Sequence, residues 1–252
     1  MLRALTFDYW DTLYDGAAEP ARVTLRQAAL RRLLDEIGSP AVPDDEFVEL
    51  YKASGKEAHR WWSDEHRGYK TGERIRWLLS RLNIERPEDC QHVARACEAV
   101  DDALLHHPPL PLPGAVDCVR ALARRYKLAI VSDTGFASGS AQDRLLEKDG
   151  LLDLFPVRVY SMDIGHAKPR REPFAAAIEA LEVKPIEALH IGDIERTDIR
   201  GALDAGMRAI RCDIVRPGGP SAAEFIARTF GDLVRYLTDP EDEVEAPEAG
   251  AL

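Results

Sequence analysis

The sequence lacks a long apolar run, a surplus of basic residues and any pairing among its cysteines. No apolar stretch in the 252 residues is long enough to cross a bilayer, so we expect no membrane span. Lysine and arginine together number 33 against 44 acidic residues, and no basic stripe suggests nucleic-acid binding. The remaining composition, 45% hydrophobic and 31% charged, is typical of an ordinary globular protein.

The cysteines and the first residues of the chain both indicate a cytoplasmic protein. The four cysteines show no Cys-x-x-Cys spacing, so we interpret them as reduced core thiols rather than as a metal or redox site. The first apolar run leads directly into Asp8, without the charged segment and cleavage site of an export signal. We therefore expect a cytoplasmic protein, and the sequence is compatible with a monomer or a homodimer.

Negative charge is concentrated at the carboxyl terminus. Six of the 44 acids fall within the last fourteen residues, "DPEDEVEAPEAGAL", and without them the formal charge of −11 would be much smaller. A segment this acidic and this poor in large apolar residues cannot bury enough surface to fold. We expect residues 239–252 to form a disordered acidic tail.

Short apolar runs rich in β-branched residues recur along the chain and predict the strands of a sheet. They read "ALTF", "KLAIV", "PVRVY", "ALHI" and "MRAIRC", and stretches with helical periodicity separate most of them. Strands that alternate with helices are typical of a parallel α/β sheet. Residues 17–107 break the alternation, because they contain four stripes of helical periodicity and no convincing strand. We predict an inserted bundle of four helices there.

Polar side chains follow four of the predicted strands at the points where these strands end. They are Asp8 after "ALTF", Ser132, Asp133 and Thr134 after "KLAIV", Lys168 after "PVRVY", and Asp193 and Asp198 after "ALHI". Ligands of open α/β sheets bind beyond the carboxyl ends of the strands, so these groups should converge on one crevice.

The converging groups form a coherent set for phosphoryl transfer. Asp8 can attack phosphorus and form an aspartyl-phosphate. Asp193 can join Asp8 in holding a hard cation such as Mg²⁺, which prefers oxygen ligands. Ser132 can donate a hydrogen bond to a phosphoryl oxygen, and Lys168 can offset the negative charge of the nucleophile and the phosphate.

Four segments resemble the four motifs of the haloacid dehalogenase-like hydrolase superfamily. They are "FDYWDTLYD", "IVSDTG", "AKPRREPF" and "HIGDIERTDIRGALDAGM", and their order and spacing match over essentially residues 1–235. The helical insert resembles the type C1 cap of that superfamily. The resemblance implies a Rossmann-like core of residues 1–16 and 108–238, a helical cap of residues 17–107, and a hydrolase that acts on phosphoric monoesters.

The resemblance also implies roles for individual residues. The implied catalytic residues are Asp8 as nucleophile, Thr12 and Ser132 as phosphate-orienting groups, and Lys168 as charge partner. The implied ligands of Mg²⁺ are Asp8, the main-chain carbonyl of Trp10, Asp193 and Asp198.

Trp10 departs from the pattern of most phosphatases in this superfamily, which have a second aspartate at that position. That aspartate protonates the leaving oxygen and later activates water, whereas an indole cannot transfer protons at neutral pH. His59 and His66 in the cap are alternative acid/base candidates, because cap closure could bring one of them over the crevice. Trp10 itself is either an aromatic plug between cap and core or a wall of the substrate pocket.

Substrate contacts are expected from both parts of the chain. The candidates are Trp10, Ser132, Asp133, Thr134, His59, Trp62 and His66. Turn chemistry alone would also explain Asp133 and Thr134, and helix packing would also explain Trp62.

Three functions are compatible with this set. The first is a Mg²⁺-dependent phosphatase of a small phosphorylated metabolite that favours leaving groups needing little protonation. The second is a 2-haloacid dehalogenase- or phosphonatase-like hydrolase that uses the same nucleophile, since dehalogenases of the superfamily carry an aromatic residue at the position of Trp10. The third is a catalytically weak protein that binds a ligand or a partner. The metal-binding form of "GDIERTD" favours the first.

Overall fold

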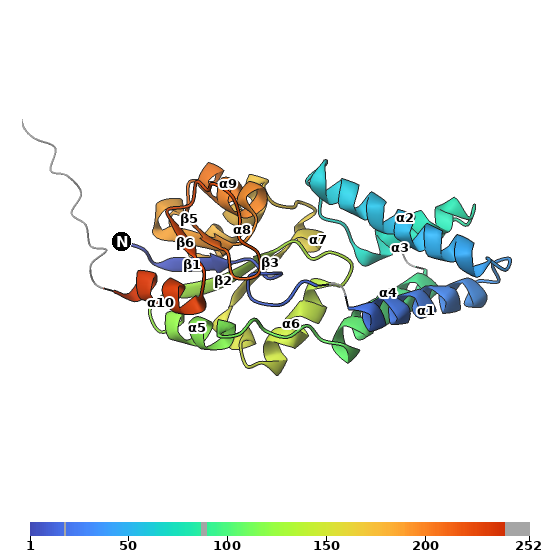
Figure 1. The fold of residues 1–252 in the computed structure, drawn as a ribbon. Coiled ribbons are helices and arrows are strands. Elements are labelled where there is room, and N and C mark those ends of the chain that lie inside the picture. The colour runs from blue at the N-terminus through green and yellow to red at the C-terminus, as the bar shows by residue number, and fades with distance from the viewer. Residues whose placement is uncertain (18, 87–89, 240–252) are drawn as a thin grey trace, which may run out of the picture.

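The computed structural model describes residues 1–17, 19–86 and 90–239, which form a parallel sheet and a separate group of four helices (Figure 1). The six strands are β1 Ala4–Phe7, β2 Lys127–Ser132, β3 Val157–Tyr160, β4 Ala188–Gly192, β5 Arg208–Cys212 and β6 Phe225–Ala227. Their spatial order is β3-β2-β1-β4-β5-β6, and every pair is parallel. Residues 240–252 of the predicted tail, and 18 and 87–89 of the predicted cap, lie outside the described residues.

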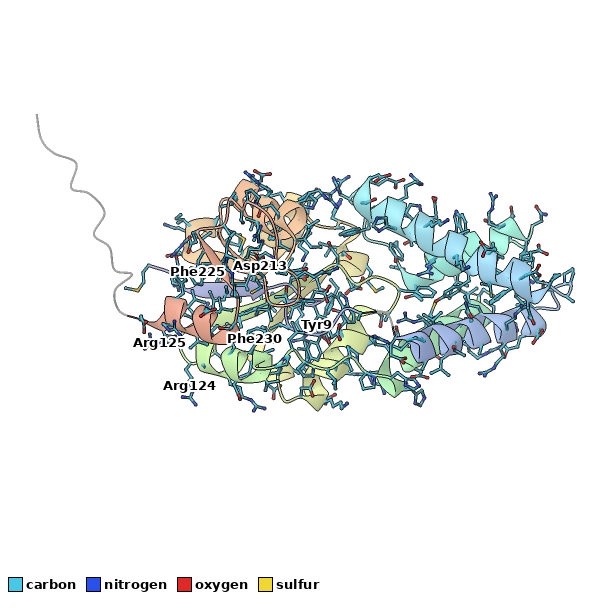
Figure 2. All side chains as sticks on the ribbon, in the orientation of Figure 1. Tyr9, Arg124, Arg125, Asp213, Phe225 and Phe230 are labelled. Atoms are coloured by element: carbon cyan, nitrogen blue, oxygen red, sulfur yellow. The ribbon has the colours of Figure 1, made fainter. Side chains whose placement is uncertain are left out.

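Five of the six strands coincide with the apolar runs that predict them, and the sequence gives no signal for β6. This edge strand has only three residues, and it is flanked by loop residues without alternating polarity. Its Phe225 ring stacks on Tyr236 with ring centroids 4.3 Å apart, so tertiary packing holds the strand in place. Figure 2 labels Phe225 on this edge strand.

Helices cover both faces of the sheet, as its alternating side chains require. On one face, apolar residues such as Phe7 and Ile130 pack against α5 (Ala115–Leu122), α6 (Gly139–Lys148) and α10 (Phe230–Thr238). On the other face, Ala129 and Val131 pack against α8 (Arg171–Leu181) and α9 (Arg200–Asp204). The result is a three-layer α/β/α fold. Shorter turns complete it: α7 Ser161–Ile164, η1 Leu152–Leu154, η2 Pro185–Glu187 and η3 Glu195–Ile199.

Four helices lie between β1 and α5 in the chain and pack beside one end of the sheet (Figure 1). They are α1 Pro20–Glu36, α2 Asp44–Ser63, α3 Thr71–Arg81 and α4 Gln91–His106, one for each predicted stripe. Their apolar stripes form a hydrophobic core of their own, which also takes in Phe136 from the loop after β2. We call this group the cap and the three-layer part the core. No helix among the described residues is long and apolar enough to cross a membrane.

The strand order brings the polar loop residues together. β1 lies between β2 and β4, with Phe7 in register with Ile130 and Ile191. Asp8 therefore emerges beside the residues that follow β2 and β4. This is the edge of the sheet that faces the cap.

Candidate active site

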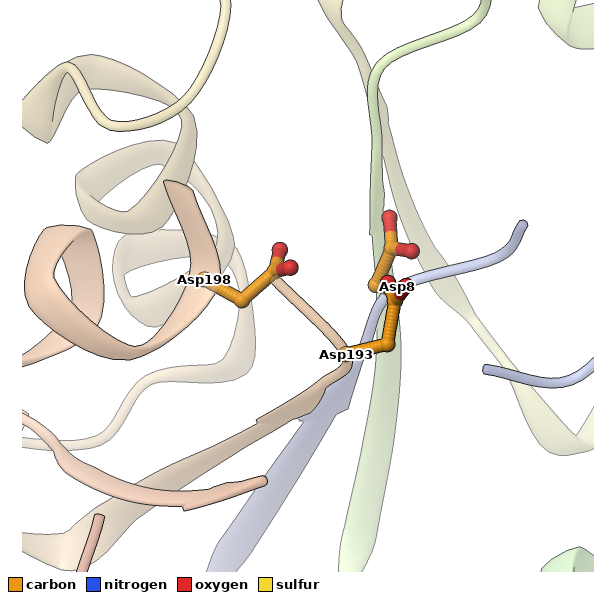
Figure 3. A group of neighbouring side chains, drawn as sticks. All are labelled: Asp8, Asp193 and Asp198. Atoms are coloured by element: carbon orange, nitrogen blue, oxygen red, sulfur yellow. The ribbon is translucent and has the colours of Figure 1, made fainter. Parts of the chain in front are cut away.

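Three aspartates meet at the carboxyl ends of β1 and β4 (Figure 3). Asp8 follows β1, Asp193 follows β4, and Asp198 lies on the π-helical turn η3. One carboxylate oxygen from each lies within 4.8 Å of the others. An all-oxygen set of this size suits a hard divalent cation such as Mg²⁺, so these residues fit the predicted metal site.

Lys168 joins two of these aspartates. Its Nζ lies 2.5 Å from Asp8 Oδ1 and 2.6 Å from Asp198 Oδ1, and its side chain is fully buried. Burial alone would lower the pKa of Lys168, but the carboxylates of Asp198, Asp8 and Asp133 outweigh burial and raise it. The lysine is therefore held charged between the predicted nucleophile and a predicted metal ligand.

The charges of this cluster do not balance. Burial raises the pKa of Asp8 well above its usual range, although Lys168 opposes the shift. Burial and the neighbouring Asp198 carboxylate raise the pKa of Asp193 to about 7. At Asp198 burial also acts upward, but Lys168 and His190 more than offset it and lower the pKa. Three carboxylates share one ammonium group, and a divalent cation would compensate the excess negative charge.

Asp198 is held rigidly by contacts that the sequence did not reveal. Its Oδ2 accepts a hydrogen bond from the Ile194 main-chain N–H at 2.9 Å, and its Oδ1 lies 3.4 Å from His190 Nε2. The other ring nitrogen of His190 lies 2.8 Å from the Thr6 hydroxyl. Gly192 is required beside this carboxylate, because a Cβ there would lie 2.5 Å from the Asp198 Cβ.

Two buried hydroxyls of predicted site residues find no hydrogen-bond partner among the described residues. They are the Oγ atoms of Ser132, at the end of β2, and Thr12, in the loop after β1. A buried hydroxyl without a partner is costly unless another group satisfies it. Both are predicted to orient a phosphate. Thr134 is different, because its main-chain N–H donates to Ser161 Oγ at 3.2 Å, and its own hydroxyl lies 3.5 Å from the same oxygen.

A cavity of about 350 Å³ opens above the three aspartates, between core and cap. Of the residues predicted to contact substrate, Trp10, Asp133, His59 and Trp62 line it. Ser132, Thr134 and His66 do not. His66 instead turns its Nδ1 toward the Trp62 carbonyl oxygen, 3.4 Å away, and toward Arg196 Nη1, 3.5 Å away.

Asp133 connects the cap to the segment that carries Lys168. Its Oδ2 accepts a hydrogen bond from Trp62 Nε1 at 2.8 Å, and its Oδ1 accepts one from the Lys168 main-chain N–H at 3.2 Å. Burial raises the pKa of this carboxyl, although Lys168 opposes the shift. Asp133 thus contacts cap and core at once, a role that turn chemistry does not indicate.

The cap also docks on the same core segment through its main chain. The Ala167 N–H donates to the His66 carbonyl at 3.0 Å, and the Gly68 N–H donates to the Gly165 carbonyl at 3.2 Å. Gly68 fits so closely that a Cβ there would lie 1.7 Å from the Ser161 carbonyl oxygen. A short antiparallel bridge therefore joins the cap to the core segment that leads into Lys168.

Several cavity residues were missed by sequence reasoning, notably Arg67, Tyr69, Arg74 and Phe136. Each fits a helix stripe or a loop in the sequence, and none lies in one of the four family-like segments. The sequence signal they share is position. Arg67 and Tyr69 lie within "HRWWSDEHRGY", Arg74 follows that segment, and Phe136 follows "IVSDTG".

Asp11 lines the cavity, but its carboxylate is engaged elsewhere. Its Oδ1 accepts a hydrogen bond from the Gly16 N–H at 2.8 Å, and its Oδ2 pairs with Arg216. Asp11 also occupies the left-handed region, with φ of 55°. Both oxygens thus hold the loop after β1, which makes this aspartate a poor substitute for the acid missing at Trp10.

Several known proteins are similar to this chain in sequence. A family model described as haloacid dehalogenase-like hydrolase matches residues 2–206. A glyceraldehyde 3-phosphate phosphatase of Methanopyrus kandleri is 32% identical over 216 residues, which cover 84% of each chain. A pyrimidine 5'-nucleotidase of Escherichia coli is 37% identical over 98 residues, which cover 38% of this chain and 42% of that relative.

A solved structure is also similar over almost the whole chain. The 2-haloacid dehalogenase from Pseudomonas syringae pv. Tomato DC3000 has a TM-score of 0.67 and 26% sequence identity, and the match covers 94% of this chain and 98% of that one.

Proposed function

Because the chain belongs to the haloacid dehalogenase-like hydrolase family, we propose that it is a Mg²⁺-dependent phosphatase of a small phosphorylated metabolite. The observation that carries the proposal is the cluster of Asp8, Asp193 and Asp198, in which Lys168 pairs with Asp8 and Asp198. A haloacid dehalogenase needs no cation, whereas three converging carboxylates suit one. The phosphatase-named relatives support the same choice.

In the first half of the reaction, a carboxylate oxygen of Asp8 attacks phosphorus and the bond to the leaving oxygen breaks. Lys168 stabilises the charge on the attacking carboxylate and on the phosphoryl oxygens. Ser132 and Thr12 supply hydroxyls that are free to donate to those oxygens. A bound Mg²⁺, held by Asp8, Asp193, Asp198 and the Trp10 carbonyl, would supply further neutralisation of the phosphoryl charge.

In the second half, water attacks the aspartyl-phosphate, releases inorganic phosphate and restores the Asp8 carboxylate. Both halves normally use a proton-transferring group, and Trp10 cannot provide one. The enzyme should therefore favour acyl and aryl phosphates, whose leaving oxygens depart with little protonation. Of the two cap histidines that are acid/base candidates, His59 and His66, only His59 lines the cavity, so we assign it the auxiliary proton transfer.

A substrate panel tests the proposal directly. Acetyl phosphate, phenyl phosphate and ethyl phosphate are compared with 2-chloropropionate, each with Mg²⁺ and with a chelator. We expect turnover of the phosphates that requires Mg²⁺ and falls in the order acyl, aryl, alkyl. Faster hydrolysis of ethyl than of phenyl phosphate would contradict the assigned leaving-group preference. Hydrolysis unaffected by the chelator would contradict the metal dependence.

Dehalogenation is the second candidate, and Trp10 is the observation that favours it. An aromatic side chain lines the cavity where the proton-transferring acid normally lies, and departing halide needs no proton. Release of chloride from 2-chloropropionate in the presence of chelator, without phosphate hydrolysis, would establish this activity instead.

A further inference from the structure

At the cap end of the cavity, Arg74 is not paired with a carboxylate of the residues that the structure describes. We propose that Arg74, supported by Tyr69, forms a subsite for a second oxyanion, a carboxylate or a phosphate, on the part of the substrate remote from the scissile phosphate. This inference rests on the proposed phosphatase function. It names the class of substrate, a small phosphate monoester that carries two anionic groups.

Arg74 lines the cavity and forms no ion pair with a carboxylate of the described residues. Its Nε donates to the Ser54 hydroxyl at 3.2 Å, and its guanidinium carbon lies 3.8 Å from the Phe136 ring centroid. It also lies over the Tyr51 ring, 5.4 Å from the centroid. Aromatic faces and a hydroxyl orient a guanidinium without cancelling its charge, so its remaining N–H donors are available to an anion.

Arg67 shows what a neutralised arginine in the same cavity looks like. Its Nη1 lies 2.6 Å from Glu73 Oε2, and its Nε lies 3.7 Å from Glu65 Oε2. The carboxylate of Glu73 is therefore taken up by Arg67 and does not reach Arg74. Two arginines of the same wall thus differ in one property, the presence of an anionic partner.

A second arginine cluster behind Phe136 increases the positive charge. Arg26 lies over the same ring, with its guanidinium carbon 5.6 Å from the centroid, and its Nε is buried without a hydrogen-bond partner. Burial lowers the pKa of Arg26, and the charges of Arg22 and Arg74 act in the same direction, whereas Tyr51 and the Asp101 carboxylate oppose the shift. Within 4 Å, none of these three arginines forms an ion pair with a carboxylate of the described residues. An anion bound at Arg74 would relieve this repulsion.

Tyr69 completes the subsite. It is buried, lines the cavity and lies close enough to Arg74 for the arginine charge to oppose the burial that raises its pKa. Its hydroxyl stays protonated and can donate a hydrogen bond to an oxyanion. The carboxylates that line the cavity all belong to core aspartates, namely Asp8, Asp11, Asp133, Asp193 and Asp198. No lining carboxylate therefore repels a second anionic group at the cap end, and a bound Mg²⁺ would compensate the negative charge at the core end.

The cavity volume limits the size of this substrate. At about 350 Å³ it lies at the small end of ligand pockets, which favours a compact metabolite over a large one. Trp10, Trp62 and Phe136 contribute aromatic rings to the cavity lining. A short or flat linker between the two anionic groups suits this wall.

The subsite is tested by the ratio of the kcat/KM values of two substrates that differ in one anionic group. Phosphoglycolate is paired with ethyl phosphate, and 4-carboxyphenyl phosphate with phenyl phosphate, so that each pair differs in one oxyanion. We expect the wild-type kcat/KM to be at least about tenfold higher for the carboxylate member of one pair, as charge-assisted hydrogen bonds allow. Arg74→Gln should bring that ratio close to one, and Arg74→Lys should retain part of it.

The matched control is Arg81→Gln, at the exposed end of the same helix and outside the cavity. Because both members of a pair are measured on one preparation, loss of folded protein cancels from the ratio. A wild-type ratio near one for both pairs, or a ratio that survives Arg74→Gln, would overturn the proposal. A ratio lost equally in Arg81→Gln would also overturn it.

Direct binding separates this inference from the proposed phosphatase activity. Benzoate and its neutral isostere benzamide are titrated in the presence of chelator, by ligand-observed NMR, into wild type and Arg74→Gln. Stronger binding of benzoate to wild type, lost in the variant, supports the subsite even if the panel shows no phosphate hydrolysis. Equal binding of both probes to both proteins contradicts the subsite even if hydrolysis is found.

Discussion

The core and the cap handle charge in opposite ways where they face the same cavity. In the core, Lys168 is buried against Asp8 and Asp198, and an excess of carboxylates surrounds it. In the cap, Arg74 lies over the aromatic rings of Phe136 and Tyr51. A lysine fixed between two carboxylates has a single orientation, which suits a single reaction. A guanidinium that lies on an aromatic ring keeps its charge available to an anionic group of the substrate.

The comparison suggests a division of work between the two parts. The core groups are tied to strand ends and to one another, so they should determine whether the reaction occurs at all. The cap groups are attached to one side of the cavity, so they should determine which molecule reacts and how often the cavity closes around it. Mutations in the two regions should therefore change different kinetic constants.

The largest effect is expected in the core, from Asp8→Asn. An amide cannot form the aspartyl-phosphate, so kcat should fall by about a thousandfold or more. The measurement is steady-state hydrolysis of phenyl phosphate with saturating Mg²⁺. Asp117→Asn, on the exposed first turn of α5, is the control. If kcat of Asp8→Asn stayed within about tenfold of wild type, the core aspartate would not be the nucleophile, and the proposed division between reaction in the core and substrate selection in the cap would be wrong.

An intermediate effect is expected at the joint between the two regions, from Gly68→Ala. The new Cβ would lie 1.7 Å from the Ser161 carbonyl oxygen, so the cap loop must shift away from the segment before Lys168. We expect kcat/KM to fall about tenfold to a hundredfold, because misplacement by an ångström is costly in a closed site.

Gly219→Ala is the control for this joint, since nothing lies within 4 Å of its Cβ position. Equal kinetics for Gly68→Ala, Gly219→Ala and wild type would show that docking of the cap loop does not position the catalytic lysine. Thermal unfolding of all three proteins checks that the loss is local.

The smallest effect is expected from His59→Ala, which asks whether the cap contributes chemistry as well as selection. If His59 assists proton transfer, kcat for ethyl phosphate should fall about tenfold, with a smaller change for phenyl phosphate. His106→Ala, at the exposed end of α4, is the control. Unchanged turnover of both substrates would confine the chemistry to the core.

The same division explains what the sequence could predict. The strands and the residues following them are local features, so "ALTF" predicts both β1 and the position of Asp8, and the fixed strand order then brings in Asp193. The four cap helices follow from their apolar periodicity. The three-residue strand β6 carries no such local pattern, because its stability comes from packing against α10.

The cap side of the site could not be predicted for a different physical reason. Which residues of α2 and α3 face the cavity depends on how the cap seats on the core, and periodicity does not encode that orientation. Arg74 looks like any solvated residue of its helix, and Asp133 looks like a turn residue, until Phe136 and Trp62 are placed beside them.

The hydrogen bond between Trp62 and Asp133 gives the molecule a built-in optical reporter. The indole belongs to the cap, the carboxylate to the core, and the second oxygen of that carboxylate holds the backbone of Lys168. If the two parts separated, this hydrogen bond would break and the indole would become exposed to water. We therefore expect a change in the emission of Trp62 to report such a movement, at the place where it would also release the backbone of Lys168.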